Sequence, residues 1–259
     1  MEKITSKSNP WVKETVRLFT SAKYRREKQQ FVLEGARLCG DTLRSGVQIL
    51  WLFVTPAFTQ KWPELFEELC ANSGRVFLIT QDIASKITDT VTPQGVFAVC
   101  SVQEREFSLD FARKYIALDQ VQDPANLGAL GRTAEALGIS GLIIGGGCDL
   151  YNPKALRASM GSLLRLPVHV CGDLAAYLSS FKGKIPLYAT VPESYVKDIT
   201  TCDFSSGAVC VIGNEGSGVS KQVKAVCDRL ITVRMRGQAE SLNAATAGAI
   251  VMWEMLRRD

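Results

Sequence analysis

The sequence predicts an α/β protein with two domains, and three observations support this prediction. Short apolar runs alternate with segments of helical period along most of the 259 residues, which is the spacing of α/β folds. The alternation stops once, in a charged and weakly periodic stretch, which predicts a linker. Glycine-rich turns follow two apolar runs near the C-terminus, where the missing Cβ lets a backbone approach a ligand closely. We therefore expect a first domain over 1–105, a linker over 106–114 and a second domain over 115–259.

Composition and cysteine usage indicate a cytoplasmic protein without a metal site. Hydrophobic residues make up 46% and charged residues 22% of the chain, near the average for soluble globular proteins. No apolar run reaches the roughly 20 residues of a membrane helix, and the N-terminal MEKITSKSNPW lacks the apolar core of a signal peptide. The eight cysteines form no CxxC pair, so the pattern favours reduced thiols over zinc ligands.

The chain has a single histidine, His169, within the apolar run LPVHVC. A lone histidine in such a run is more often packed or hydrogen-bonded than catalytic. Chemistry that needs two histidines is therefore excluded. The net charge of +4 is modest, so the distribution of charge says more about partners than its sum.

The first domain is expected to open with a helix over 11–20, with Ser8 as its N-cap and Pro10 in its first turn. The basic stretch AKYRREKQQ follows at 22–30. It is either a solvated helix face or loop, or a phosphate-binding surface. Beyond it, the pattern predicts strands at 30–33, 49–55, 75–79 and 95–102, and helices at 34–45, 63–71 and 81–87.

The second domain repeats the alternation and ends in a helix from Leu242 that is crowded with alanine and glycine. Small residues in that helix predict a tight crossing with a neighbouring segment or protomer. The polar stretch 192–206 is expected to be a loop. Strands are predicted at 115–119, 141–145, 166–170, 185–190, 209–212 and 230–233, and helices near Asn126, after the glycine-rich turn at 145–147, and at 174–181.

Two glycine motifs were compared with phosphate-binding signatures. GNEGSGVS follows a strand as a P-loop does, but Val219 occupies the position of the lysine that must reach the phosphates. GLIIGGGCD provides only the first two glycines of a dinucleotide fingerprint, because the sixth position is Leu150. Hydrolysis of ATP or GTP and Rossmann-type NAD binding are both disfavoured.

The segment DPANLGALGRTAEALG places Asn126 and Arg132 at the start of a helix. Six residues do not stack on one helical face, so we expect Asn126 to cap the helix from its loop. Arg132 has two interpretations. It forms a surface ion pair with Glu135, or it grips a phosphate at the mouth of a site through its planar guanidinium.

Three segments, DPANLGALGRTAEALG, VIGNEGSGVS and SLNAATAGAIVMWE, resemble the three ordered motifs of the SpoU (TrmH-like) branch of the SPOUT RNA methyltransferases. The resemblance covers 115 to the C-terminus, and NPWVK and FVLEGARLCGD resemble the family's L30e-like substrate-binding domain more weakly. It implies a C-terminal α/β-knot domain with a deep trefoil knot, an exception to the rule against threaded chains. It also implies S-adenosylmethionine as cofactor, an RNA substrate, and a homodimer whose site is completed across the interface.

The resemblance also implies roles for individual residues. One departure concerns the usual Ile-Pro-Met, replaced here by Val233-Arg234-Met235, where the lost proline frees the backbone and adds a charge. The matching catalytic and substrate-side positions are Asn126, Arg132, Glu215, Ser241 and Asn243, and the cofactor positions are Thr190, Gly213, Val233, Met235 and Leu242.

The expected activity is methylation of a ribose 2′-hydroxyl without a metal. The expected substrate is 23S-type rRNA. Arg132 is too weak a base to remove the hydroxyl proton alone. We expect it to bind the 3′-phosphate and stabilise the developing alkoxide, with the proton passing to phosphate or water, while Ser241 caps the final helix. Three alternatives remain open: a tRNA substrate, a non-catalytic RNA-binding relative, and an α/β enzyme with another adenosine cofactor.

Overall fold

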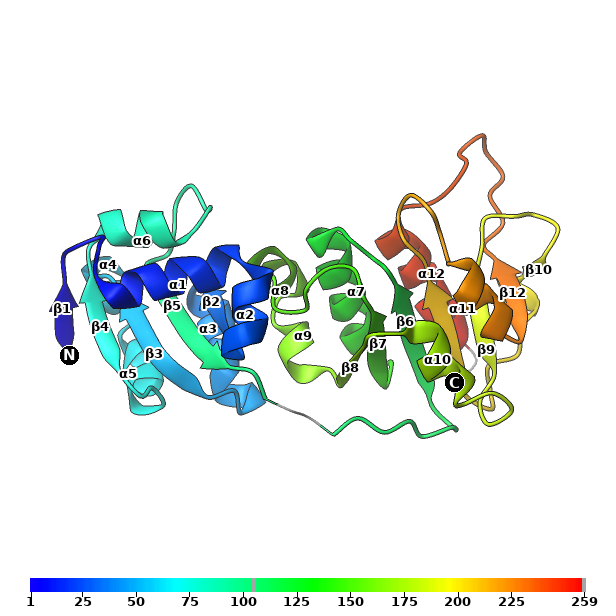
Figure 1. Ribbon diagram of the computed structural model, residues 1–259, viewed down its shortest axis with the longest axis horizontal. Helices are drawn as coiled ribbons and strands as arrows, with labels where there is room; N and C mark the ends of the chain where they lie inside the picture. Colours follow the sequence, from blue (N-terminus) through cyan, green and yellow to red (C-terminus); the bar gives the residue numbers. More distant parts are fainter. Residues whose placement is uncertain (104–105, 258–259) are drawn as a thin grey trace. The chain divides into compact units, whose positions relative to one another are not determined.

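The computed structural model describes residues 1–103 and 106–257, which form two compact units (Figure 1). The first unit contains the described residues up to 103 together with Leu150–Leu164, and the second contains the rest. The expected boundary between 105 and 106 adjoins residues 104 and 105, which lie outside the described part. The division into 1–105, 106–114 and 115–259 stays a proposal, and the first strand of the second unit begins at Lys114.

The first unit is built on a mixed sheet of five strands. These strands are β1 (Glu2–Ile4), β2 (Gln30–Glu34), β3 (Ile49–Val54), β4 (Val76–Ile79) and β5 (Val96–Ser101). Their order in the sheet is β1-β4-β3-β5-β2, in which β5 runs antiparallel to both of its neighbours. The sheet confirms the expected α/β class for this part of the chain.

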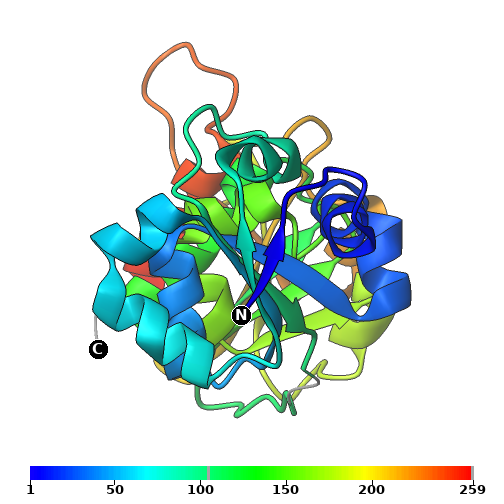
Figure 2. The same cartoon turned by 90° about the vertical axis from the view of Figure 1, so that its left-hand side faces the viewer.

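Helices cover both faces of this sheet: α1 (Pro10–Thr20), α2 (Ala22–Lys28), α3 (Ala36–Ser45), α4 (Pro56–Lys61), α5 (Pro63–Ala71) and α6 (Gln81–Ile87). Figures 1 and 2 show α1 and α6 on one face and α3 and α5 on the other. The core beneath α1 and α6 includes Trp51, Phe53 and Phe77, which are buried.

Two predicted helix starts in this unit are wrong. Asn9, not Ser8, caps α1, because its Oδ1 accepts a hydrogen bond from the amide of Trp11 at 2.9 Å. Glu34 ends strand β2 instead of opening a helix, and α3 starts two residues later, at Ala36. The basic stretch at 22–30 contributes a helix, α2, in which Arg25 is buried and donates to the carbonyl oxygen of Leu18 at 2.7 Å.

The segment Leu150–Leu164 packs with the first unit although it lies far along the chain. It contains α8 (Pro153–Ser159) and most of α9 (Ser162–Arg165). Tyr151 stacks on Phe31, with ring centroids 4.5 Å apart. Arg157 donates to the buried carboxylate of Glu34 at 2.8 Å and to Asp89 at 2.9 Å. Alternation of strands and helices gives no sign of such a return.

The second unit is built on a parallel sheet of seven strands. These strands are β6 (Lys114–Asp119), β7 (Gly141–Gly145), β8 (Val168–Cys171), β9 (Leu187–Thr190), β10 (Lys197–Asp198), β11 (Ala208–Ile212) and β12 (Arg229–Thr232). Their order is β10-β12-β9-β11-β6-β7-β8. Every described pairing in this sheet is parallel, which confirms the α/β class.

The helices of this unit are α7 (Pro124–Leu137), α10 (Leu174–Ser179), α11 (Lys221–Val226) and α12 (Ala244–Leu256), with a short 3₁₀ turn at Ile199–Thr201. Helices α10 and α11 share a core with the sheet, and α12 packs against α7 and β11 (Figure 1). After β12 the chain therefore returns past β9 and β11 to reach α12. The trefoil knot implied by the resemblance stays a prediction.

Three further expectations in this unit are corrected by the structure. Asp123 caps α7, because its Oδ1 accepts from the amide of Ala125 at 2.8 Å, and Asn126 lies inside the helix. Asn243 caps α12 in place of Ser241, accepting from the amide of Ala245 at 2.9 Å. The stretch expected to be a loop includes β10 and the 3₁₀ turn. Among the described residues, none of the helices is both long and apolar enough to span a membrane.

Candidate functional site

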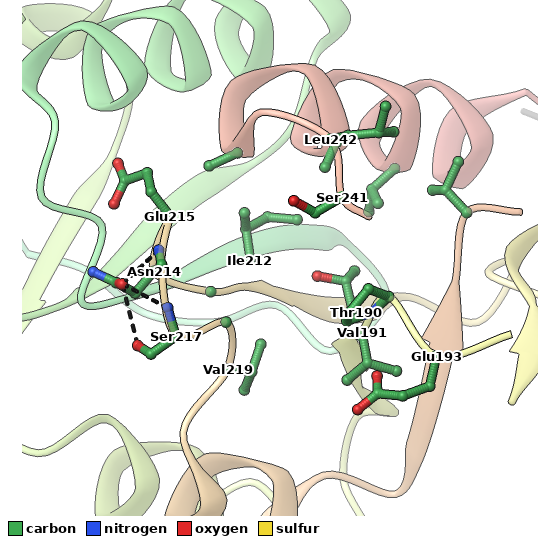
Figure 3. A pocket seen from close by; sticks show the side chains of 18 of the residues that line it. Thr190, Val191, Glu193, Ile212, Asn214, Glu215, Ser217, Val219, Ser241 and Leu242 are labelled. Atoms are coloured by element: carbon green, nitrogen blue, oxygen red, sulfur yellow. Dashed lines mark hydrogen bonds between the residues drawn. The ribbon is translucent and has the colours of Figure 1, made fainter. Parts of the chain in front are cut away.

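A cavity of about 280 Å³ lies at the carboxyl ends of three adjacent parallel strands, β12, β9 and β11. Parallel α/β sheets bind ligands at this end, because the loops that leave the strands converge there. The volume far exceeds the roughly 15 Å³ that one water molecule occupies by the same measure, so the cavity is not a packing defect. The segment after β12 and the first turns of α12 close one side (Figure 3).

The glycine loop after β11 forms a tight turn that exposes its backbone to this cavity. Asn214 and Gly218 exchange two backbone hydrogen bonds, of 3.1 and 2.9 Å. The Oδ1 of Asn214 also accepts from the amides of Gly216 and Ser217 at 2.9 and 3.0 Å (Figure 3). A Cβ on Gly213 would lie 2.2 Å from the backbone of Gly218, so only glycine permits this closure.

The residue that replaces the P-loop lysine has a structural role. Val219 is buried and belongs to the apolar core between the sheet and helices α10 and α11. Ser220 then caps α11, and its amide donates to Asp119 at 2.7 Å. A lysine at 219 would carry its charge into that core, so the geometry agrees with the exclusion of a P-loop.

Glu215 holds together segments that are distant in the sequence. Its carboxylate accepts from the backbone amides of Gln122 and Asp123, each at 3.0 Å, and from the Nδ2 of Asn126 at 2.8 Å. Desolvation opposes ionisation of Glu215, but the hydrogen bonds outweigh it and lower the pKa of its carboxyl below the ordinary value. The carboxylate is thus fixed in its charged form at the start of α7.

Asn126 extends this network to the final helix. It is buried, and its Oδ1 accepts from the Nδ2 of Asn243 at 3.0 Å. Because Asn243 also caps α12, one chain of hydrogen bonds joins the glycine loop, α7 and α12. The structure therefore brings together Glu215, Asn126 and Asn243, three of the five residues expected on the catalytic side.

Arg132 lies apart from the cavity formed by its own chain. It is exposed on α7 and forms no hydrogen bond or ion pair with any of the described residues. The alternative interpretation, an ion pair with Glu135, does not hold, because Glu135 receives a two-pronged bond from Arg165, with one contact of 2.8 Å. The guanidinium is thus unpaired within the described part of the chain.

The predicted residues divide between the cavity and its surroundings. Ser241 and Glu215 line the cavity, whereas Arg132, Asn126 and Asn243 do not. All the expected cofactor positions line it, namely Thr190, Gly213, Val233, Met235 and Leu242.

The departure at Arg234 leaves the cavity unchanged in charge. The side chain points outward, 65% exposed, and its Nε lies 3.0 Å from the carboxylate of Asp198 at the end of β10. Val233 and Met235, which precede and follow Arg234 in the chain, both line the cavity. The ion pair ties the segment after β12 to the adjacent strand, although exposed pairs of this kind contribute little stability.

Two charged residues of the cavity wall, Glu193 and Lys224, were not predicted from the sequence. Their charges lie close together, with the Lys224 Nζ 3.9 Å from the Glu193 Oε1. The Oε2 of Glu193 is buried and has no hydrogen-bond partner. Glu193 follows the end of strand β9 by three residues, so the strand-end rule could have identified it. A buried, unpartnered carboxylate oxygen fits a ligand with a hydrogen-bond donor.

His169 lies outside the site. It stacks against Phe107 and Tyr177, with centroids 5.5 and 4.3 Å away, on the edge strand β8. Burial lowers the pKa of its imidazole. These contacts agree with a packed histidine. Within the described ranges, no cluster of three or more histidine, cysteine or carboxylate side chains could hold a metal ion.

Comparison with known families assigns the two parts of the chain separately. The profile of the SpoU rRNA Methylase family matches residues 113–253. The profile of the MRM3-like substrate binding domain matches residues 9–98. The two matches follow the two-part organisation of the fold, apart from the segment Leu150–Leu164.

Individual relatives match over nearly the full length. The 23S rRNA (guanosine(2553)-2′-O)-methyltransferase of Bacillus subtilis is 33% identical, over 98% of this chain and 99% of its own. A structure of AdoMet-bound rRNA methyltransferase from Sinorhizobium meliloti is similar with a TM-score of 0.87 and 30% identity, covering 99% of this chain and 98% of that one. The structure of an RNA 2′-O ribose methyltransferase gives a TM-score of 0.82 at 25% identity, with coverage of 99% and 98%.

Proposed function

The chain belongs to the SpoU family of RNA methylases, S-adenosylmethionine-dependent enzymes that methylate ribose 2′-hydroxyls, and we propose that it acts on 23S-type ribosomal RNA. The observation that carries the proposal is the cavity at the carboxyl ends of β9, β11 and β12, lined by the glycine loop, by apolar side chains and by three charged side chains. The rRNA substrate is supported by the relative from Bacillus subtilis, which matches along both units.

We propose that Thr190, Gly213, Val233, Met235 and Leu242 hold the cofactor in this cavity. When bound, S-adenosylmethionine supplies an electrophilic methyl group. The closed turn at 213–218 brings backbone amides and carbonyls to the cavity without intervening side chains, which suits an adenosine group. The orphaned oxygen of Glu193 indicates that the wall is built for a polar ligand and not for a lipid.

The protein's own contribution to methyl transfer is to position the ribose and to control charge. We propose that Arg132 binds the 3′-phosphate of the target nucleotide and stabilises the alkoxide as the 2′-hydroxyl loses its proton to phosphate or water. Its free guanidinium and exposed position on α7 support this role. Glu215, Asn126 and Asn243 fix the start of α7 relative to the glycine loop, and Ser241 at the cavity rim contacts the substrate.

We also propose that the protein is a homodimer in the cytoplasm. Ile250 and Trp253 lie one turn apart on α12 and are 38% and 60% exposed, an apolar surface suited to a second copy. Because Arg132 does not reach the cavity of its own chain, a partner's cavity is the natural destination for its charge. A cytoplasmic location agrees with eight cysteines that are all free thiols.

Mapping of ribose methylation tests the substrate. RNA from cells with and without the gene is compared nucleotide by nucleotide, and purified protein with S-adenosylmethionine is then added to the unmodified RNA. We expect one 2′-O-methyl group in the large-subunit rRNA to disappear with the gene and to return on addition of the protein. Loss of a methyl group from tRNA instead would show that the substrate is tRNA. Normal methylation in both samples would indicate a non-catalytic relative.

A further inference from the structure

Glu193 differs from the other acidic residues near the ends of the parallel sheet. Asp119 accepts from the amide of Ser220 at 2.7 Å, and Asp228 accepts from the amide of Leu187 at 2.9 Å, so each holds the backbone in place. Glu193 accepts no hydrogen bond from any residue that the structure describes, and its Oε2 is shut off from solvent. A carboxylate oxygen that is buried and unpaired carries a cost in the free protein that structure alone does not offset.

Glu193 belongs to the wall of the cavity, although its Oε2 is itself closed off from water. The residue lines the cavity next to Thr190 and Val191, at the end of β9 (Figure 3). Only three charged side chains line the cavity in the described part of the chain: Glu193, Glu215 and Lys224. Glu215 is already engaged by Asn126 and by backbone amides. Glu193 is therefore the carboxylate that a bound ligand can engage without breaking an existing bond.

Lys224 lies beside Glu193 at this end of the cavity but does not form a hydrogen bond with its buried oxygen. Its Nζ lies 3.9 Å from the Glu193 Oε1, which is too long for a hydrogen bond and leaves Oε2 untouched. The two side chains are about one-third exposed, so water screens their attraction. The pair thus presents an acceptor and a cation side by side at one end of the cavity.

We propose that Glu193 recognises the cofactor through a hydrogen-bond donor on it, and that its carboxylate turns an oxygen into the cavity to accept this bond. The inference rests on the proposed binding of S-adenosylmethionine in this cavity. That molecule offers two donors of the required kind, the ribose cis-diol and the α-ammonium group. A carboxylate accepts from either, and the adjacent Lys224 suits the carboxylate that accompanies the ammonium group.

Calorimetric titration of the purified full chain separates these sources. The probes are S-adenosylmethionine, S-adenosylhomocysteine and 5′-methylthioadenosine, which keeps the ribose but lacks the ammonium and carboxylate groups. Glu193→Gln removes the charge with little change in shape. Glu240→Gln is the matched control, since Glu240 is an exposed residue of the neighbouring segment that does not line the cavity.

Glu193→Gln should weaken S-adenosylmethionine and S-adenosylhomocysteine by about tenfold to a hundredfold, as loss of a charge-assisted hydrogen bond does. An equal loss for 5′-methylthioadenosine assigns the bond to the ribose, and unchanged binding of that probe assigns it to the ammonium group. Both results support the proposal. Equal affinities of Glu193→Gln and Glu240→Gln for all three probes would overturn it.

Two controls keep this result separate from other failures. If the unaltered protein binds none of the probes, the proposed cofactor is wrong, whereas normal binding by the unaltered protein and by Glu193→Gln defeats only the role of Glu193. Thermal unfolding of each variant establishes that it is folded before titration. Because a charged oxygen that is buried without a partner is replaced by a neutral amide, Glu193→Gln should unfold at the same temperature as the unaltered protein or higher.

Discussion

At the scale of single residues, the site separates side chains that hold the backbone from side chains that are free to act. Hydrogen bonds join Glu215, Asn126 and Asn243 to one another and to the start of α7. Neither Arg132 nor the Oε2 of Glu193 has a hydrogen-bond partner among the described residues. A residue without a structural partner can be changed with little loss of stability, so its contribution to activity can be measured cleanly.

Replacement of Arg132 by alanine should reduce methyl transfer by at least about a hundredfold, because the phosphate contact and the charge that stabilises the alkoxide are both lost. Affinity for S-adenosylmethionine should change less than about twofold, because Arg132 does not line the cavity. Single-turnover methylation and calorimetry measure the two effects. Arg132→Lys is the matched variant and should recover part of the rate, since it keeps the charge but not the fork. Substantial turnover by Arg132→Ala would refute the assignment.

Glu215 should make stability depend on pH in the acid range. The pKa of its carboxyl is lowered in the folded protein, so its contribution to stability is complete above the ordinary value of 4.5 and is lost as the pH falls through the lower folded value. Glu215→Gln should therefore unfold at lower urea concentration than the unaltered protein at pH 7. The gap should narrow as the pH drops below 4.5. A gap that stays constant down to pH 3 would contradict the ionised network.

At the scale of elements, the close contact between α7 and α12 depends on one missing side chain. A Cβ added at Gly248 would lie 2.2 Å from the Cδ2 of Leu130 on α7. Leu130 is fully buried, so it has little room to move away. The cluster of small residues in the final helix was predicted to permit a tight crossing, and the structure shows that crossing within the chain.

Gly248→Ala tests this contact. Alanine is favoured over glycine in a helix by about 1 kcal/mol, but overpacking costs about 1–3 kcal/mol, so we expect a net loss of unfolding free energy. Gly40→Ala in α3 is the control, because its nearest neighbour, a Leu65 methyl, would lie 3.3 Å away. That change should cost less stability than Gly248→Ala, because the Leu65 methyl has to shift by only a few tenths of an ångström. Urea unfolding of both variants compares them, and equal gains in stability would show that α12 has room to spare.

At the scale of the whole molecule, Arg132 and the cavity of the same chain lie apart. Among the described residues, Lys224 is the one basic side chain in the cavity wall, where it lies beside Glu193, and the arginine proposed to bind the RNA phosphate lies outside the cavity. The same part of the chain exposes an apolar pair on α12. Pairing of two copies would cover the apolar surface and could deliver Arg132 to the partner, so that oligomeric state and activity are linked.

Trp253→Glu should yield a folded monomer with little methyltransferase activity, because a charge in the centre of an apolar interface is costly to bury. Light scattering measures the mass, and thermal unfolding confirms the fold. Trp62→Glu is the control, since Trp62 is also exposed, at 40%, but belongs to the first unit. If the unaltered protein is monomeric and fully active, the proposed dimer has no role in the mechanism.

The sequence by itself determined the α/β class, the order of most of the strands and longer helices along the chain, and the absence of a P-loop lysine. These features follow from local periodicity and from single positions such as Val219. Two of the three motifs that resemble the SpoU family, VIGNEGSGVS and SLNAATAGAIVMWE, contain residues that line the cavity.

Only the tertiary structure decided which polar groups are satisfied. Glu215 and Asn126 are 89 positions apart, and Asn126 and Asn243 are 117 apart, so their hydrogen bonds leave no local pattern. The same reason explains the wrong caps at Ser8, Asn126 and Ser241, where several polar residues compete and the final geometry selects one. It also explains Glu193, whose free oxygen becomes visible only when every neighbour has been placed.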